Sequence, residues 1–468
     1  MAAPLPPGPR GRLLSGSLAD FRRDRLGFLA RTAREHGDVA AFRFGARRIY
    51  LVSDPRLIEE VLVTRSRDYM KHFALRLNPV VLGNGLLTSE GDFWLRQRRL
   101  IQPVFQRNAL AAYVPDMAAA ARRVLGSWEA GQTRDVQAEM MRITLIIAAK
   151  ALFGAEVEKE ARHVGNALEV LLERFRVRFA SMFWLPRWVP TPGNVRLWRA
   201  VRKLDEIIYG FIRRRRESPG EKKDLLSILL HARDEGGGGM TDRQLRDEAM
   251  TLFLAGHETT ALTLTWSWYL LATNPDAAEC LAAEVDAVLG GREPTLDDLP
   301  RLRYAEQVVQ ESMRILPPVY TIGREALHEG ELGGYRVPAG TTLLMSQWVL
   351  HRDERFFDAP LKFRPERWGE EKIKELPRFA YFPFGGGPRQ CIGNTFAMIE
   401  SVLVLAMLAQ RYRFTVLPDP PVEPFPTFTL RPLHGIKAVV TPRGTRPAGR
   451  VLVTEAQRHG ESVYEPEA

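Results

Sequence analysis

Apolar and polar positions alternate in two different ways along the chain. In residues 38–52 the apolar side chains recur at every second position, which predicts two short strands around a turn at Gly45-Ala46. Residues 108–234 show helical spacing instead, and we expect several helices there. The expected breaks between these helices lie near Ala130-Gly131, Gly154 and residues 186–193.

Three further elements are expected before residue 108. Asp54-Pro55 predicts the start of a helix that runs to about Val63, because proline is favoured at the first helical position. Residues 69–90 mix apolar side chains with glycines, and we expect an irregular segment. Helical spacing resumes over residues 91–105.

One long helix contains the most apolar run of the chain. A capping box that begins at Thr241 opens this helix, which is expected to continue to about Asn274. Its stretch 250–272 is long enough to span a membrane, but His257 and Glu258 would be costly at the centre of a bilayer. We therefore expect a buried core helix.

The C-terminal part combines a helix with short strands. Residues 304–318 form an amphipathic pattern that ends at two prolines. Short strands are expected within residues 319–346, and a closing hairpin within 423–443. The composition then becomes polar and irregular, which predicts a disordered tail over 444–468.

Composition narrows the class of protein. The chain has 468 residues, of which 45% are hydrophobic and 26% charged, so it can bury a large core. Its two cysteines, Cys280 and Cys391, indicate a reducing, cytoplasmic setting rather than a disulfide framework. The N-terminus shows no apolar stretch typical of a secretory signal. A formal charge of +10 with no nucleic-acid-binding motif favours an acidic protein partner.

The most particular stretch is residues 382–400, with Cys391 near its centre. Three glycines, Gly385 to Gly387, and Pro388 predict a loop with an unusual backbone path, and helical spacing begins at Asn394. A cysteine at the start of a helix lies where backbone N–H groups favour the thiolate. A thiolate is a soft ligand for a transition metal, and on iron it favours O–O cleavage. The alternative is a buried structural cysteine.

This loop resembles the haem-ligand loop of the cytochrome P-450 monooxygenases. The matching positions are Phe384, Gly385, Gly387, Arg389, Cys391 and Gly393. The resemblance extends over about residues 4–443 and implies one domain over 1–443 with the family's fold. That fold is mainly α with a small β portion, and haem b lies buried between a long central helix and the cysteine-loop helix. Cys391 is implied as the iron ligand, and no transmembrane anchor is expected.

Polar residues interrupt the apolar half of the long helix. Gly256 lacks a side chain, which would let a flat cofactor approach the backbone, and Glu258 and Thr259 supply an acid and an alcohol. These residues match a second family motif, which implies that Thr259 hydrogen-bonds iron-bound dioxygen and Glu258 relays protons to it. A zinc-protease helix is excluded, because Ala261 stands where a second histidine is required. We expect His257 to be a satisfied core histidine.

Several residues match family positions that contact the haem propionates. Trp94 and Arg98 lie four residues apart on one helical face and fit the motif W-x-x-x-R. Arg324 occupies the position of a family arginine that reaches a propionate, Arg389 is a third candidate, and His351 is a weaker one. Two propionates carry two negative charges, so several cationic partners are physically reasonable.

A further motif concerns structure rather than chemistry. Glu311 and Arg314 fit the family's E-x-x-R pair, and Arg367, from the segment 363–368, is the candidate third member. A planar guanidinium can bridge carboxylates and backbone carbonyls at once. The resemblance therefore implies a clamp behind the haem loop that serves folding and haem retention.

The substrate is assigned less specifically. Candidate pocket residues are Phe73, Leu75, Leu82, Phe183, Phe253 and Phe428. Residues 178–192 resemble the family's mobile lid by position, and core packing is the alternative for each pocket candidate. The motif forms look closer to the fatty-acid-, terpenoid- and carotenoid-hydroxylating branches than to the camphor type, so we expect a hydrophobic substrate.

The implied reaction inserts one oxygen atom from dioxygen into this substrate. The residues after Cys391 are too few for a reductase domain, so we expect electrons from an acidic ferredoxin or flavodoxin with an NAD(P)H-dependent reductase. We also expect a monomer. Arg96 and Arg99 are candidates for the docking face, or are plain surface arginines. The alternative functions are a haem-thiolate peroxygenase, a non-oxygenating isomerase and a non-catalytic haem sensor.

Overall fold

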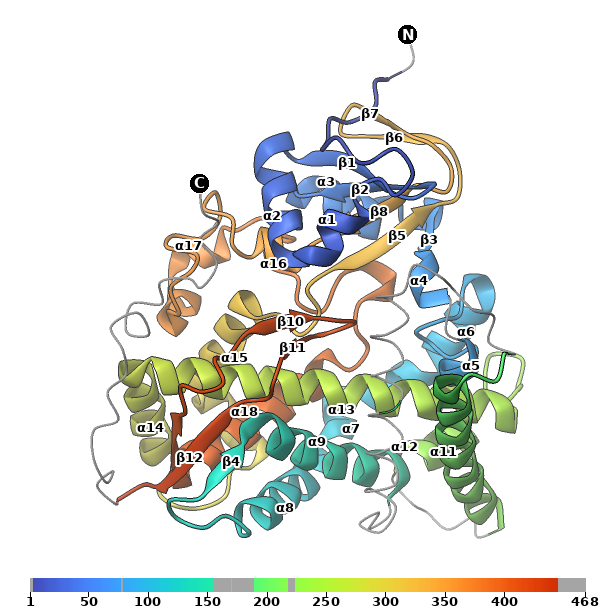
Figure 1. The fold of residues 1–468 in the computed structure, drawn as a ribbon. Coiled ribbons are helices and arrows are strands. Elements are labelled where there is room, and N and C mark those ends of the chain that lie inside the picture. Colours follow the sequence, from blue (N-terminus) through green and yellow to red (C-terminus); the bar gives the residue numbers. More distant parts are fainter. Residues whose placement is uncertain (1–2, 77–78, 155–169, 171–188, 218–223, 445–468) are drawn as a thin grey trace.

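One helix, α13 (Asp242–Thr273), crosses the whole molecule, and the other elements are arranged around it (Figure 1). The computed structural model describes residues 3–76, 79–154, 170, 189–217 and 224–444. The hydroxyl of Thr241 accepts a hydrogen bond from the Gln244 N–H, and the Gln244 side chain accepts one from the Thr241 N–H, so the predicted capping box is present. The helix ends at Asn274 as expected, and most of its second half is buried.

Other helices pack around α13 and bury two large apolar clusters. They are α8 (Val114–Leu125), α9 (Val136–Phe153), α11 (Pro192–Glu217), α12 (Leu225–His231), α14 (Pro275–Leu289), α15 (Arg303–Ile315) and α18 (Asn394–Arg411). Two predicted breaks are confirmed, because Gly131 has φ +77° and Gly154 ends α9 with φ +60°. In the part of the chain that is described, no helix is long and apolar enough to cross a membrane.

A five-stranded sheet lies on one side of this helical body (Figure 1). Its strand order is β1 (Val39–Phe44), β2 (Arg47–Val52), β8 (Thr342–Met345), β5 (Ile322–Ala326) and β3 (Tyr69–Lys71). The pair β2–β8 is parallel and the other pairs are antiparallel. The hairpin β1–β2 confirms the two strands predicted within residues 38–52.

Smaller elements complete the fold. Among the described residues, the further α-helices are α1 (Leu18–Arg23), α2 (Arg25–His36), α3 (Pro55–Glu59), α4 (Phe73–Arg76), α5 (Pro79–Leu82), α6 (Gly91–Ile101), α7 (Arg107–Leu110), α16 (Gln347–Leu350) and α17 (Glu371–Lys374). The remaining strands are β4 (Thr133–Asp135), β6 (Gly330–Leu332), β7 (Tyr335–Val337), β9 (Tyr412–Val416), β10 (Pro424–Pro426), β11 (Leu430–Pro432) and β12 (Lys437–Pro442). The helix after Asp54 and the C-terminal hairpin β10–β11 are as predicted.

One segment differs from its prediction. Residues 69–90 were expected to be irregular, but they contain strand β3 and the four-residue helices α4 and α5. Strand β3 exists because Tyr69 to Lys71 pair with β5, which is distant in sequence, and a local pattern does not reveal such pairing. Four residues are also too few to show a helical period. The expected tail beyond Gly444 lies outside the described residues.

Candidate functional site

The loop before α18 follows a path that requires glycine. Gly385 and Gly387 both have φ +68°. A Cβ atom on Gly387 would lie 1.8 Å from the carbonyl oxygen of Leu62, and one on Gly386 would lie 2.2 Å from the Phe379 ring. The predicted unusual backbone is therefore confirmed.

This path places Cys391 just before the first turn of α18. Its N–H donates a hydrogen bond to the Phe384 carbonyl at 3.0 Å. Its side chain is accessible although it lies deep in the fold, so the sulfur faces an internal space. Burial raises the pKa of the Cys391 thiol, while the Gly393 N–H and the Arg98 guanidinium oppose that rise. A metal cation at the sulfur would stabilise the thiolate further. The donor set therefore fits a thiolate-ligated metal.

The middle of α13 faces an open space as well. Ala255 is exposed and Gly256 and Thr259 are half-buried, whereas their neighbours on the helix are mostly buried. A Cβ atom on Gly256 would meet no atom within 4 Å. The Thr259 hydroxyl donates to the Ala255 carbonyl at 2.7 Å, which leaves its oxygen free to accept a hydrogen bond. This side of α13 has room for a flat group.

Three arginines gather near the cysteine loop, and a buried lysine lies beside them. Arg98 donates to the Gln390 carbonyl at 2.9 Å, and the Arg389 guanidinium lies 4.1 Å from the centre of the Trp94 ring. Arg324 on β5 is the register partner of buried Lys71 on β3. The structure therefore brings the predicted residues Trp94, Arg98, Arg324 and Arg389 into one region.

The charges of this cluster are unbalanced. Glu90 pairs with Arg389 and accepts a hydrogen bond from the Lys71 N–H at 2.8 Å. Burial and the nearby charge of Arg389, opposed by Glu90, together lower the pKa of Arg324 to about 10. Two added carboxylates would neutralise the excess positive charge. The cluster thus fits a cofactor with two acid groups. Lys71 and Glu90 were missed, because Lys71 lies in the strand that sequence reasoning did not find.

His351 does not belong to this cluster. The ring is fully buried, its Nε2 accepts a hydrogen bond from the Phe382 N–H at 3.0 Å, and it packs against Tyr381 and Phe382. Its assignment as a propionate partner is therefore corrected. Burial and the neighbouring charge of Arg314 lower its pKa, so it is a neutral packing residue behind the loop.

Glu311, Arg314 and Arg367 meet in a fully buried cluster. Arg314 donates two hydrogen bonds of 2.9 Å to Glu311, and the Arg367 Nε donates another of 2.9 Å. Arg314 also reaches the His351 and Pro360 carbonyls at 2.7 Å each. This is the three-membered arrangement that the motifs predicted.

Sequence reasoning missed a fourth side chain of this cluster. The Trp368 Nε1–H donates to Glu311 Oε2 at 3.0 Å. Trp368 directly follows Arg367 within the segment 363–368, but the sequence pattern does not indicate that its indole N–H binds a buried carboxylate. We call Glu311, Arg314, Arg367 and Trp368 the Glu311 clamp.

Glu258 is paired in a way that the sequence did not indicate. Its Oε1 accepts a hydrogen bond from the Thr429 hydroxyl at 2.8 Å and pairs with Arg431 Nη2, both from the β11 region. The glutamate is buried. Its neighbour His257 contacts the Met141 carbonyl at 3.0 Å, as expected for a satisfied core histidine. Burial lowers the pKa of His257 to about 4.

The pocket candidates have different environments. Phe428 lies on the β10–β11 turn and is 39% exposed, and Phe73 and Leu75 are half-buried on α4. Leu82 and Phe253 are buried in the apolar core beside α9 and α11, so the structure assigns these two to the core. Phe183, with most of the expected lid, lies outside the described residues.

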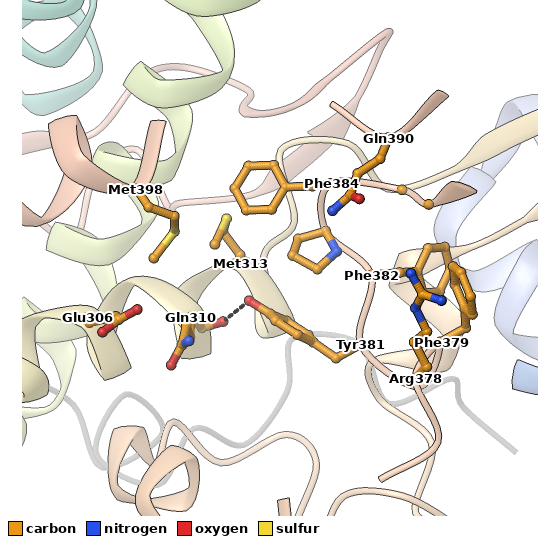
Figure 2. Close-up of a pocket in the computed structure, with 13 residues that line it drawn as sticks. Glu306, Gln310, Met313, Arg378, Phe379, Tyr381, Phe382, Phe384, Gln390 and Met398 are labelled. Carbon is orange, nitrogen blue, oxygen red and sulfur yellow. Dashed lines mark hydrogen bonds between the residues drawn. The ribbon is translucent and has the colours of Figure 1, made fainter. Parts of the chain in front are cut away.

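A cavity of about 330 Å³ borders the cysteine loop next to α15 (Figure 2). Gln310 and Met313 of α15 line it, together with Phe384 and Gln390 of the loop and Arg378. None of its lining residues belongs to α13, so this cavity is distinct from the space beside Gly256.

The whole chain was compared with known proteins. The family model for cytochrome P-450 matches residues 6–438. The chain belongs to the cytochrome P-450 family. Cyclooctatin synthase of Streptomyces melanosporofaciens is 39% identical over 426 residues, which cover 90% of this chain and 92% of the relative. Pentalenene oxygenase of Streptomyces avermitilis is 35% identical over 395 residues, which cover 83% of this chain and 87% of the relative.

Solved structures agree with the family assignment. A retinoic-acid-bound cyanobacterial cytochrome P-450 is similar with a TM-score of 0.84 and 26% identity, and the match covers 94% of this chain and 100% of that structure. The predicted cytochrome P-450 fold is therefore confirmed. The family also confirms the expected haem cofactor and the expected class of enzyme, a monooxygenase that uses redox partners and acts on a hydrophobic substrate.

Proposed function

We propose that this cytochrome P-450 hydroxylates a cyclic terpenoid. The observation that carries the proposal is the similarity over most of the chain to three bacterial enzymes: cyclooctatin synthase, cyclooctat-9-en-7-ol 5-monooxygenase and pentalenene oxygenase. The half-buried and exposed candidates Phe73, Leu75 and Phe428 supply apolar surface for such a ligand. The structural neighbour that binds retinoic acid supports an isoprenoid ligand as well.

The residues of the site have separate tasks in this proposal. Cys391 would bind the iron through its sulfur, and Arg98, Arg324 and Arg389 would hold the two propionates. The Lys71 ammonium group is engaged elsewhere, because it donates to the Leu86 and Leu87 carbonyls. When bound, the haem supplies the chemistry that activates dioxygen and inserts one oxygen atom into a C–H bond.

The residues of α13 would act beside the cofactor. Ala255 and Gly256 leave space for the flat macrocycle. The Thr259 oxygen accepts a hydrogen bond and passes a proton onward, and Glu258 supplies that proton. Phe384 and the Glu311 clamp fix the loop from behind.

The electron donor is proposed to be an acidic ferredoxin or flavodoxin. Arg99 and Arg378 have side chains that are 65% and 64% exposed, and their ion pairs with Glu235 and Glu59 are long, at 3.6 and 3.7 Å. Such loosely paired arginines can contact an acidic surface. Arg96 is bound to Asp234 at 2.6 Å and is removed from the docking face. We expect the reconstituted reaction to slow at high salt, because exposed charges are then screened.

The proposed setting is the cytoplasm, supported by two free cysteines, and the proposed state is a monomer.

A binding titration of the ferric protein tests the proposed substrate. Pentalenene, retinoic acid and a long-chain saturated fatty acid would be added separately while the haem Soret band is followed. We expect a shift to high spin with pentalenene, because an apolar ring system would exclude water from the metal. A shift with the fatty acid alone would contradict the terpenoid proposal. Product formation with peroxide as the sole oxidant, but not with redox partners, would favour a peroxygenase instead.

A further inference from the structure

The loop between α5 and α6, residues 83–90, is bound to α13 by buried acids. Helix α5 lies beside the N-terminal part of α13 (Figure 1). Oδ2 of Asp247 accepts a hydrogen bond from the Asn84 N–H at 2.9 Å. Oε2 of the next residue, Glu248, accepts one from the Leu86 N–H at 2.9 Å. Two neighbouring residues of one helix therefore hold the α5–α6 loop through its backbone.

The loop approaches α13 so closely that glycine is required. Gly83 has φ +55°, and a Cβ atom there would lie 2.0 Å from Oδ1 of Asp247. A Cβ atom on Gly85 would lie 2.3 Å from the Thr251 hydroxyl. A backbone at this distance covers the acids of α13, and Glu248 is only 1% exposed. The carboxyl group of Glu248 therefore meets solvent only when the loop moves away.

Lys71 binds the same loop from the side of the sheet. Its ammonium group donates to the Leu86 carbonyl at 2.8 Å and to the Leu87 carbonyl. Its backbone N–H donates to Glu90 at 2.8 Å, and Glu90 pairs with Arg389. The α5–α6 loop thus connects α13 with the arginines near the cysteine loop.

The two acids of α13 differ in their counter-ions. Asp247 accepts a hydrogen bond of 2.9 Å from Arg246, whose guanidinium also binds Asp205 at 2.7 Å. Glu248 forms no ion pair with any of the described residues, and its bond to the loop is the one from the Leu86 N–H. An ionised Glu248 under a closed loop is therefore a buried charge without a bonded cation, which is costly.

Proton exchange at Glu248 falls near neutral pH. Burial is the largest of the effects that bring its pKa from the ordinary 4.5 to about 7. The charge of Asp247 acts in the same direction, while the Leu86 N–H and the Lys71 ammonium group act against it. The further charged groups around Lys71 and the loop are Glu90, Arg389, Arg324, Arg246 and Asp205. A closed loop thus favours the protonated acid.

We propose that Glu248 is a positioning residue, which in its protonated form holds the α5–α6 loop against α13 and which releases the loop when the proton passes to water. Release lets water solvate the new carboxylate beside Asp247. The effect on substrate rests on the function proposed above, since the pocket candidates Phe73 and Leu75 on α4 follow directly after Lys71. We expect substrate to leave the protein faster above neutral pH.

The size of the effect follows from the two protonation equilibria. Glu248 has a pKa of about 7 under the closed loop and regains the ordinary value of 4.5 in the open one. The open loop therefore gains as the pH rises through this interval. Between pH 6 and pH 8 the equilibrium constant for opening should increase about tenfold, and it should level off at higher pH.

Hydrogen exchange of the loop amides tests this without turnover. Exchange at Asn84 and Leu86 would be followed by mass spectrometry between pH 6 and pH 8 in the haem-loaded wild type and in Glu248→Gln. Chemical exchange itself quickens with pH, so each wild-type rate is divided by the variant's rate at the same pH. We expect this ratio to rise about tenfold, because the neutral glutamine amide accepts from the Leu86 N–H at every pH. Glu235→Gln, whose side chain is 92% exposed, is the matched control and should give the wild-type ratio.

The second test measures how fast substrate is released. Ferric protein loaded with pentalenene would be mixed with excess pyridine, which binds the iron once the site is vacant, while the Soret band is followed. We expect release about tenfold faster at pH 8 than at pH 6 in the wild type, and equal rates at the two pH values in Glu248→Gln. A rising exchange ratio without faster release would overturn the link between the loop and the substrate.

An exchange ratio that stays constant from pH 6 to pH 8 would overturn the whole proposal. If Glu248→Gln fails to fold, Lys71→Met decides. Loss of the lysine charge should move the additional rise in exchange to higher pH than in the wild type, and an unmoved rise contradicts the proposal. If no proposed ligand shifts the Soret band of the wild type, the proposed function fails, whereas the exchange comparison still tests the loop.

Discussion

Two buried glutamates of this protein each pair with arginine, but they are bound in different ways. Glu311 accepts hydrogen bonds from Arg314, Arg367 and Trp368 through both of its oxygens, and its side chain is 0% exposed. Glu258 uses one oxygen for Arg431 and Thr429, and its arginine is partly exposed. Each has a buried neutral histidine nearby, namely His351 and His257.

The difference indicates two uses of one kind of ion pair. A fully bonded carboxylate in a dry place is costly to disturb, because any lost partner leaves a buried charge. It suits a clamp that fixes the cysteine loop. A carboxylate with a spare oxygen, next to a partly exposed guanidinium, can exchange its partner for water. It suits proton transfer.

Replacement of the clamp glutamate should have the largest effect. Glu311→Gln leaves two buried guanidinium groups without their counter-ion, and breaking a buried pair costs about 3–5 kcal/mol. We expect this loss in the free energy of unfolding, together with reduced haem content, measured by denaturant titration and by the Soret absorbance. Glu366→Gln, an exposed neighbour on the same segment, is the control. An equal cost for Glu258→Gln would erase the contrast between the two glutamates.

Acid should lower the free energy of unfolding through His257, the buried neighbour of Glu258. Its pKa of about 4 in the folded protein lies below the ordinary value of 6.5. The unfolded chain therefore binds the proton first, so the stability contribution of neutral His257 is complete above pH 6.5 and is lost as the pH falls towards 4. This loss amounts to about 3 kcal/mol. We expect His257→Gln to lose less stability than the wild type over this interval in unfolding titrations; parallel curves would contradict the prediction.

Removal of a single donor from the clamp should cost less. Trp368→Phe deletes the hydrogen bond to Glu311 but keeps an aromatic ring against Tyr381. A hydrogen bond to a charged group contributes about 1.5–3 kcal/mol. We expect a loss of this size in the free energy of unfolding, with haem still bound. A neutral result would show that the two arginines alone satisfy the glutamate.

The smallest effect is expected at Thr429. Thr429→Val keeps the shape of the side chain and removes one hydrogen bond to the Glu258 carboxylate. We expect a cost of about 1.5 kcal/mol, the lower end for a hydrogen bond to a charged group, because Arg431 still pairs with the same oxygen. Because one restraint on the Glu258 carboxylate is lost, we expect a clear change in the fraction of consumed electrons that is recovered in oxidised product. The thermal unfolding temperature should change little. Thr427→Val on the same turn is a useful comparison, since its hydroxyl donates to the Thr429 carbonyl instead. If both variants behaved alike, Thr429 would merely stabilise the turn.

Local patterns predicted the long elements well. The capping box at Thr241, the hairpin within 38–52 and the glycine-dependent loop at Gly385 and Gly387 each depend on residues close in sequence, and each is present. The family motifs also led to the right three members of the Glu311 clamp.

What was missed depends on contacts between distant segments. Arg431 and Glu258 lie on different elements, and the local sequence around one residue does not indicate contact with the other. Lys71 was overlooked because its strand exists only through pairing with β5. His351 was misassigned because its sequence shows a titratable ring but not the direction in which the ring points.

The contact between Gly387 and the Leu62 carbonyl links the iron-ligand loop to a residue from the opposite end of the chain. During synthesis Leu62 leaves the ribosome long before Gly387 does. Contacts of such long separation form slowly, because the intervening chain must be ordered before they are gained. The ligand loop is therefore among the last parts to take shape, and we expect haem capture to follow release of the finished polypeptide.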